Sequence, residues 1–152
     1  MKRIITIILC AVLCLVPMAG FASAESLSQG YTGNVDYLID IKNPEAVTTS
    51  TASKVCVVSA VAVPGTTVTL YKYDESAGKY VKMYSDGKAL EAVVGAAGLF
   101  AQNIELRSGA NNILVVASMG DNVETIKLDI TLVKNNSIAD SLRNIWQTII
   151  GN

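Results

Sequence analysis

Apolar residues recur at every second position in several short runs of this chain, and each run ends at turn-forming residues. In the clearest case, Ile126, Leu128, Ile130 and Leu132 alternate with polar side chains. A period of two places neighbouring side chains on opposite faces of a β-strand. The same period, or a dense run of β-branched residues, occurs in residues 35–42, 54–63, 66–73, 79–85, 99–106 and 112–118. The sequence therefore predicts about seven strands, with a weaker eighth strand at residues 92–94.

Two of the connections carry a specific turn signal. "DESAG" joins the strands of 66–73 and 79–85, which predicts an antiparallel hairpin. In "RSGAN", we expect Gly109 to adopt a positive φ and Asn111 to bond neighbouring backbone groups, so that this turn has a structural role.

The chain changes period after residue 134. Ile138, Leu142, Ile145, Trp146 and Ile149 fall on one face of a helix, which we expect within residues 135–152. A short amphipathic helix needs a surface on which to bury its apolar face. The sequence leaves three alternatives for that surface: the chain's own β-domain, a groove on a protein partner or second copy, and a membrane surface.

Short strands with frequent turns and no helical period before residue 137 predict an all-β domain, an immunoglobulin-like antiparallel β-sandwich at residues 35–134. "PGTTVTLYKYD" followed by "GLFAQNIELRSGANNILVVAS" resembles the bacterial Ig-like modules of secreted and cell-surface proteins. The resemblance rests on a Pro-Gly turn before a strand and on Gly98, Phe100, Leu106, Gly109 and Asn111. It implies a spacer, an adhesion domain or a companion of carbohydrate-active enzymes.

The first 24 residues have the features of a secretory signal peptide. Lys2 and Arg3 precede an apolar stretch of 13 residues, which is shorter than the roughly 20 residues that span a bilayer. Ala22 and Ala24 fit a cleavage before Glu25. We therefore expect a secreted protein, extracellular or at the cell envelope, with no stable membrane anchor after cleavage. Residues 25–34, "ESLSQGYTGN", are predicted to be a flexible linker.

Several classes of chemistry lack their usual residues. The chain has no histidine, which removes the commonest general base and metal ligand. Ser76 to Lys79 and Ser85 to Lys88 match a Ser-x-x-Lys spacing, but both lie in expected turns, where the helical geometry of that motif fails. Acidic turn residues show no EF-hand spacing, and no glycine-rich phosphate loop is present. We expect no enzyme activity, no catalytic residues, no metal site and no cofactor.

Net charge and cysteine content bear on nucleic-acid binding and on the role of Cys56. Removing residues 1–24 takes away two of the 12 Lys and Arg and none of the 13 Asp and Glu, which leaves a net charge of −3. Lysine and arginine are scattered, so we expect no nucleic-acid binding. Cys56 is the one cysteine that remains and is predicted to be a small buried strand residue.

The hairpin carries the candidate binding face. If Tyr73 lies opposite Tyr80, then Tyr71 lies opposite Lys82, and Tyr84 follows on the same face. Aromatic rings with hydroxyl groups form a platform on which sugar rings stack. Tyrosine is also an ordinary strand residue, and cross-strand tyrosine pairs stabilise sheets without binding a ligand.

These features predict a secreted, non-enzymatic binding or structural module, with cell-wall polysaccharide or a surface protein as its partner. The alternative is a small secreted accessory or inhibitor protein that engages a protein partner through its C-terminal helix.

Overall fold

The computed structural model describes residues 24–133 and residue 146, and this part of the chain contains twelve strands. The largest sheet has the order β1 (Ser26–Ser28), β6 (Lys79–Lys82), β5 (Thr67–Asp74), β11 (Gly109–Met119), β12 (Asn122–Leu132) and β3 (Thr48–Thr51), with β9 (Glu91–Val93) also paired to β5. The second sheet has the order β10 (Leu99–Glu105), β4 (Val55–Ala62) and β2 (Ile39–Asn43). A small hairpin joins β7 (Tyr84–Ser85) to β8 (Lys88–Ala89). All pairs are antiparallel except β12 with β3, which is parallel.

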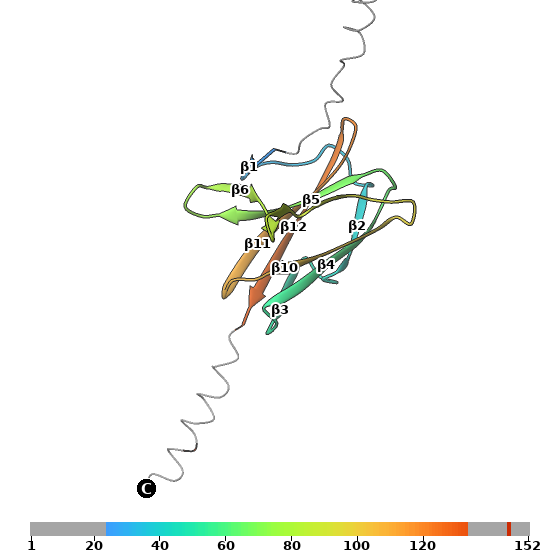
Figure 1. Ribbon diagram of the computed structural model, residues 1–152. Helices are drawn as coiled ribbons and strands as arrows, with labels where there is room; N and C mark the ends of the chain where they lie inside the picture. Colours follow the sequence, from blue (N-terminus) through green and yellow to red (C-terminus); the bar gives the residue numbers. More distant parts are fainter. Residues whose placement is uncertain (1–23, 134–145, 147–152) are drawn as a thin grey trace, which may run out of the picture.

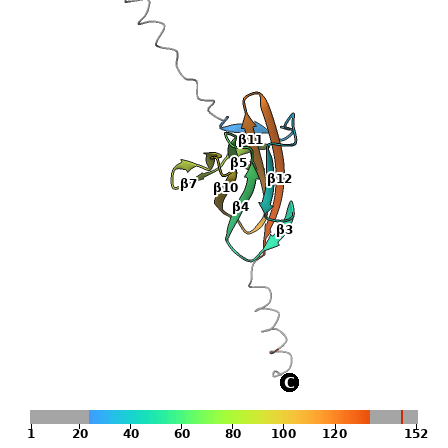
Figure 2. The same cartoon turned by 90° about the vertical axis from the view of Figure 1, so that its right-hand side faces the viewer.

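The main apolar core lies between the two larger sheets (Figures 1 and 2). Leu70, Val115 and Leu128 reach it from the seven-stranded sheet, and Val58 and Ile104 reach it from the three-stranded sheet. These residues belong to the alternating apolar positions, so the period of two correctly marks the faces that are buried.

The all-β prediction is confirmed for the described residues, but two details of the predicted fold class are wrong. The described residues form twelve strands rather than about seven, because the predicted strand of 79–85 divides into β6 and β7 and the sequence did not reveal β1, β3 or β8. The structure also contains no helical element among its described residues. The predicted C-terminal helix of 135–152 is therefore not supported. Apart from Trp146, it lies outside the described residues.

Residues 25–34 do not behave as the predicted linker. Residues 26–28 form β1, which pairs with β6 at the edge of the large sheet (Figure 1). Leu27 and Tyr31 pack against a second, smaller apolar cluster on the face of this sheet that points away from the main core. A polar segment with two glycines is typical of a linker, but the pairing of β1 and the packing of its apolar side chains hold this segment on the sheet.

The chain then crosses toward the second sheet along the β11–β12 hairpin. The backbone N–H of Gly33 donates to Thr125 Oγ1 at 3.1 Å, and the side chain of Asn34 exchanges hydrogen bonds with the backbone of Asp121 and Val123. The buried carboxylate of Glu124 accepts the backbone N–H groups of residues 38 and 39, at 2.6 and 3.1 Å. Such bonds satisfy backbone donors that no sheet partner reaches.

Candidate functional site

The predicted register of the tyrosine face is correct for Tyr71, Tyr73 and Tyr80, but the face is not an open surface. Tyr84 does not continue this ribbon as predicted, because it lies in β7 and pairs with Ala89 of β8. Tyr73 pairs with Tyr80, and Tyr71 pairs with Lys82. The rings of Tyr73 and Tyr80 meet edge to face, with centroids 5.2 Å apart. However, Tyr71 is 1% exposed and Tyr80 is 5% exposed, because the N-terminal segment covers them. These tyrosines form a second core, so they offer no stacking platform.

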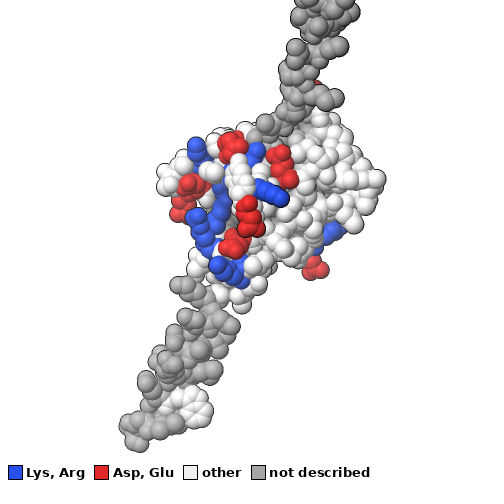
Figure 3. Space-filling model, in the orientation of Figure 1, with Lys and Arg blue, Asp and Glu red and all other residues white. Residues whose placement is uncertain are grey.

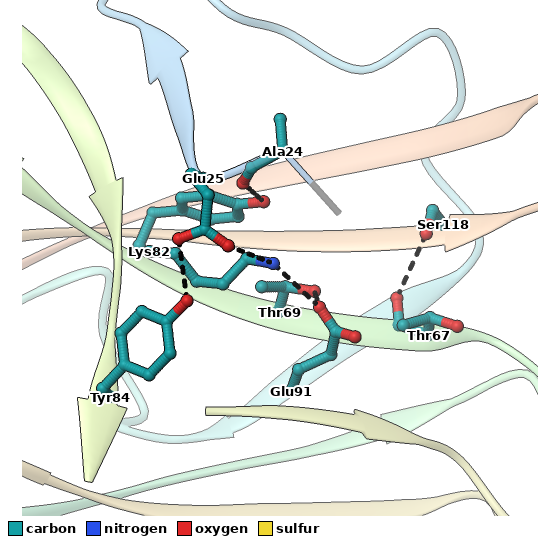
Figure 4. A network of polar contacts seen from close by, with 9 residues as sticks. Ala24, Glu25, Thr67, Thr69, Lys82, Tyr84, Glu91 and Ser118 are labelled. Atoms are coloured by element: carbon teal, nitrogen blue, oxygen red, sulfur yellow. Dashed lines mark hydrogen bonds and ion pairs between the residues drawn. The ribbon is translucent and has the colours of Figure 1, made fainter. Parts of the chain in front are cut away.

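Lys82 is also engaged within the protein. Its side chain is 6% exposed, and its ammonium lies 3.5 Å from Glu91 and 3.7 Å from Glu25 (Figure 4). The Tyr84 hydroxyl donates to Glu25 at 2.7 Å, which raises the pKa of that tyrosine because the bond requires the protonated phenol. The Tyr71 hydroxyl donates to the carbonyl of Ala24 at 2.9 Å. This network fastens β1 to the sheet, which is a structural role.

A polar hollow of about 670 Å³ lies at one end of the fold, between the β5–β6 hairpin and the link from β10 to β11. Along β5, Lys72 and Asp74 alternate with the tyrosines and therefore point to the other face of the strand. Charged residues gather on this side of the molecule, over the region of β6 and β11 (Figure 3). The hollow is lined among others by Lys72, Asp74, Met83, Tyr84, Arg107 and Ser108.

The wall formed by the β10–β11 link is held by one buried side chain. Asn111 is 1% exposed, and its amide donates to the carbonyls of Arg107, Gly109 and Ile130 at 2.8 to 3.1 Å. Its Oδ1 accepts the backbone N–H of Arg107 at 2.8 Å. Gly109 has a φ of 87°, a conformation that a side chain would strain. The predicted structural roles of Asn111 and Gly109 are thus confirmed.

The same Asn111 oxygen positions Lys72. The Lys72 ammonium donates to Asn111 Oδ1 at 2.9 Å, and Lys72 forms no ion pair with any described residue. An ammonium has three donors, so two of them are left for solvent or a ligand in the hollow. Partial burial lowers the pKa of Lys72, and the nearby positive charge of Arg107 lowers it further. A half-buried cation with a shifted pKa in a hollow is a candidate ligand-binding group.

The lowered pKa of Lys72 predicts a pH dependence of stability. The folded protein releases this proton at a lower pH than the unfolded chain, whose lysines titrate near 10.5. Between these two pKa values the unfolded state binds more protons than the folded state. The free energy of unfolding therefore rises with pH over this range. We expect the free energy of unfolding of the wild type to rise relative to that of Lys72→Met between neutral pH and pH 10.5. Parallel curves in urea titrations at several pH values would contradict this.

The carboxylates around the hollow are mostly engaged. Asp74 Oδ1 accepts the hydroxyl and backbone N–H of Ser76 and the N–H of Ala77, and these bonds lower the pKa of Asp74. Glu105 lies 3.7 Å from the ammonium of Lys54. No group of three or more Cys, Asp or Glu that could hold a metal ion occurs in the described part of the chain.

The remaining predicted residues lie away from this hollow. Cys56 is half-buried beside the main core, and burial raises the pKa of its thiol, so the thiolate that reacts is disfavoured. Trp146 is 60% exposed. The other residues of the predicted partner helix, Ile138, Leu142, Ile145 and Ile149, lie outside the described residues.

Sequence reasoning did not single out Lys72 or Arg107. The signal that was available is that Lys72 follows Val68 and Leu70 on one face of β5, so a cation stands where the alternation has placed apolar side chains. Among the described residues, no helix is long and apolar enough to cross a membrane.

Comparisons with known proteins assign no family. No family model matches the chain, and no curated protein matches it. One similar solved structure is an FMN-binding β-glucuronidase from Facaelibacterium prausnitzii L2-6, with a TM-score of 0.38 and 18% sequence identity. The match covers 66% of this chain but 13% of the glucuronidase chain. This likeness assigns neither a family nor an activity.

Proposed function

We propose that this chain is a secreted, non-enzymatic binding module that holds polysaccharide outside the cell or at the cell envelope, and that the polar hollow is its binding site. The observation that carries the proposal is the Lys72 ammonium, which is fixed by Asn111 and has two donors free for a ligand. Buried polar groups that converge on a concave surface are the usual means of ligand recognition.

The other lining groups suit a hydroxyl-rich ligand. Ser108 provides a hydroxyl, and Tyr84, which is 52% exposed, provides an aromatic ring at the rim. Sugars combine hydroxyl groups with apolar ring faces, so they use both kinds of contact. The expected secretion, which rests on residues 1–24, would bring the module to such polymers.

The side chains of the hollow suit binding rather than catalysis. A chain without histidine has no side chain whose unperturbed pKa lies near neutral pH. Asp74 accepts hydrogen bonds from its own turn and Glu105 faces Lys54, so these two carboxylates of the hollow are not arranged as a general acid and base.

Filling the hollow should abolish binding. We expect Ser108→Trp to lose retention of the purified protein on insoluble cell-wall material and on a polysaccharide panel, because the indole occupies the space beside Lys72. Ala101→Trp is the matched control, since Ala101 is exposed on β10 and does not line this hollow. If neither the wild type nor the control is retained, or if Ser108→Trp is retained as well as both, the proposed function is wrong.

A further inference from the structure

Two cations share the hollow, and their charges are unequally compensated. The guanidinium of Arg107 is exposed and lies close enough to Lys72 to lower its pKa. The pKa of Asp74 is lowered mainly by its hydrogen bonds from Ser76 and Ala77, and the charge of Arg107 adds a smaller contribution in the same direction. No carboxylate acts on Lys72 in the same way. Lys72 is therefore a half-buried cation of the lining that pairs with no described carboxylate.

The carboxylates of the lining do not compensate Lys72. Asp74 is committed to the turn at Ser76 and Ala77, and Glu105 faces Lys54. Glu75 is exposed on the hairpin turn, where solvent screens its charge. The third cation of the lining, Lys82, is matched by Glu25 and Glu91.

We propose that the hollow selects acidic polysaccharides, and that one carboxylate or phosphodiester group of the polymer binds between the Lys72 ammonium and the Arg107 guanidinium. This inference rests on the proposed function and gives it a ligand class. A negatively charged group supplies the missing counter-charge, whereas a neutral sugar leaves the half-buried ammonium uncompensated.

The two cations suit this task in different ways. The ammonium is a compact point charge with two free donors, and the guanidinium is a planar fork that matches two oxygens of one carboxylate or phosphate. Asn111 holds both elements, because its Oδ1 accepts the Lys72 ammonium and the Arg107 backbone N–H. A site held in place before binding loses less entropy when the ligand arrives.

The test compares polymers that differ in charge. The full-length protein is titrated with polygalacturonate, with the same polymer fully methyl-esterified, and with poly(glycerol phosphate). We expect esterification to weaken binding by about 10-fold or more, and Lys72→Gln and Arg107→Gln each to weaken binding of the acidic polymer by about 10-fold. Lys127→Gln removes the same charge from an exposed site on β12 and should change affinity less than about 2-fold. Thermal unfolding of each variant confirms that it is folded.

The outcomes distinguish failure of the acidic-ligand inference from failure of the proposed polysaccharide binding. Preference for polygalacturonate identifies a carboxylate, and preference for poly(glycerol phosphate) identifies a phosphodiester. Equal binding of the acidic and esterified polymers, unchanged by Lys72→Gln or Arg107→Gln, overturns the inference and leaves the proposed function standing. A second titration, with galacturonate and glycerol phosphate as small anions, follows the lysine ε-CH₂ signals by NMR. If no polymer is retained but Lys72 responds to these anions, the proposed function fails and the anion site stands.

Discussion

Replacing Asn111 with alanine is expected to lower the free energy of unfolding by about 3 kcal/mol. The change removes the amide that satisfies the carbonyls of Arg107, Gly109 and Ile130, and the oxygen that accepts from Arg107 and Lys72. The Ile130 carbonyl is bonded in a buried setting, where an unpaired acceptor is costly. Urea unfolding followed by circular dichroism measures the difference.

The neighbouring asparagine provides the control. Asn112 is half-buried and forms no side-chain hydrogen bond within the described residues, so Asn112→Ala should change the free energy of unfolding by less than about 0.5 kcal/mol. Equal destabilisation by the two variants would contradict the role assigned to Asn111. Asn111→Ala should also weaken polysaccharide binding, because Lys72 loses the group that positions it.

Gly33→Ala is expected to destabilise the fold by about 3 kcal/mol, near the upper end for overpacking. A Cβ atom at Gly33 would clash with the carbonyl oxygen of Val123 and would lie 2.7 Å from the Cα of Glu124. Both contacts are with backbone, which cannot move aside as a flexible side chain can. The N-terminal segment would have to lift from the β11–β12 hairpin, and its bonds to Glu124 would be strained.

Gly30→Ala tests whether the effect is local. A Cβ at Gly30 meets no atom within 4 Å, and its backbone conformation does not require glycine. We therefore expect its free energy of unfolding to stay within about 0.5 kcal/mol of the wild type. A Gly33→Ala protein as stable as Gly30→Ala would show that the segment does not pack as described.

The sequence predicted strands well where one face of the strand is buried in the main core. The alternation in residues 126–132 and the paired tyrosines of the hairpin both locate the strand and its register, because the side-chain period of a strand is two. β3 was missed because "TTST" shows no apolar alternation, and its partner β12 lies far along the chain. No local pattern reveals such a pairing.

The error about the candidate site follows from the error about the N-terminal segment. The hairpin register was correct, so Tyr71, Tyr80 and Lys82 do lie on one face. The prediction of an open face depends on the prediction that residues 25–34 are a linker. Instead, Leu27 and Tyr31 cover it, and Glu25 pairs with Lys82. Covering a face is a long-range event, whereas composition reports only local polarity.

The hollow could not be predicted from the sequence for a related reason. Lys72 and Arg107 come from strands and links that meet only in the folded chain, and each is an ordinary isolated cation in the sequence. What the sequence did contain was the role of Asn111, because an asparagine just after a glycine turn bonds nearby backbone. The bonding of Asn111 to nearby backbone was predictable from the sequence, but its contact with Lys72 was not.

The docking of residues 33–39 onto the β11–β12 hairpin also predicts an order of events in folding. These residues are made early, yet their hydrogen-bond partners at positions 121–125 lie more than 80 residues later in the sequence. Contacts of such long sequence separation close large loops and form late. We expect substitutions in this segment to raise the unfolding rate while leaving the folding rate nearly unchanged. A contact that forms after the transition state changes the unfolding rate and not the folding rate. The segment therefore determines how long the folded protein lasts rather than how quickly it forms.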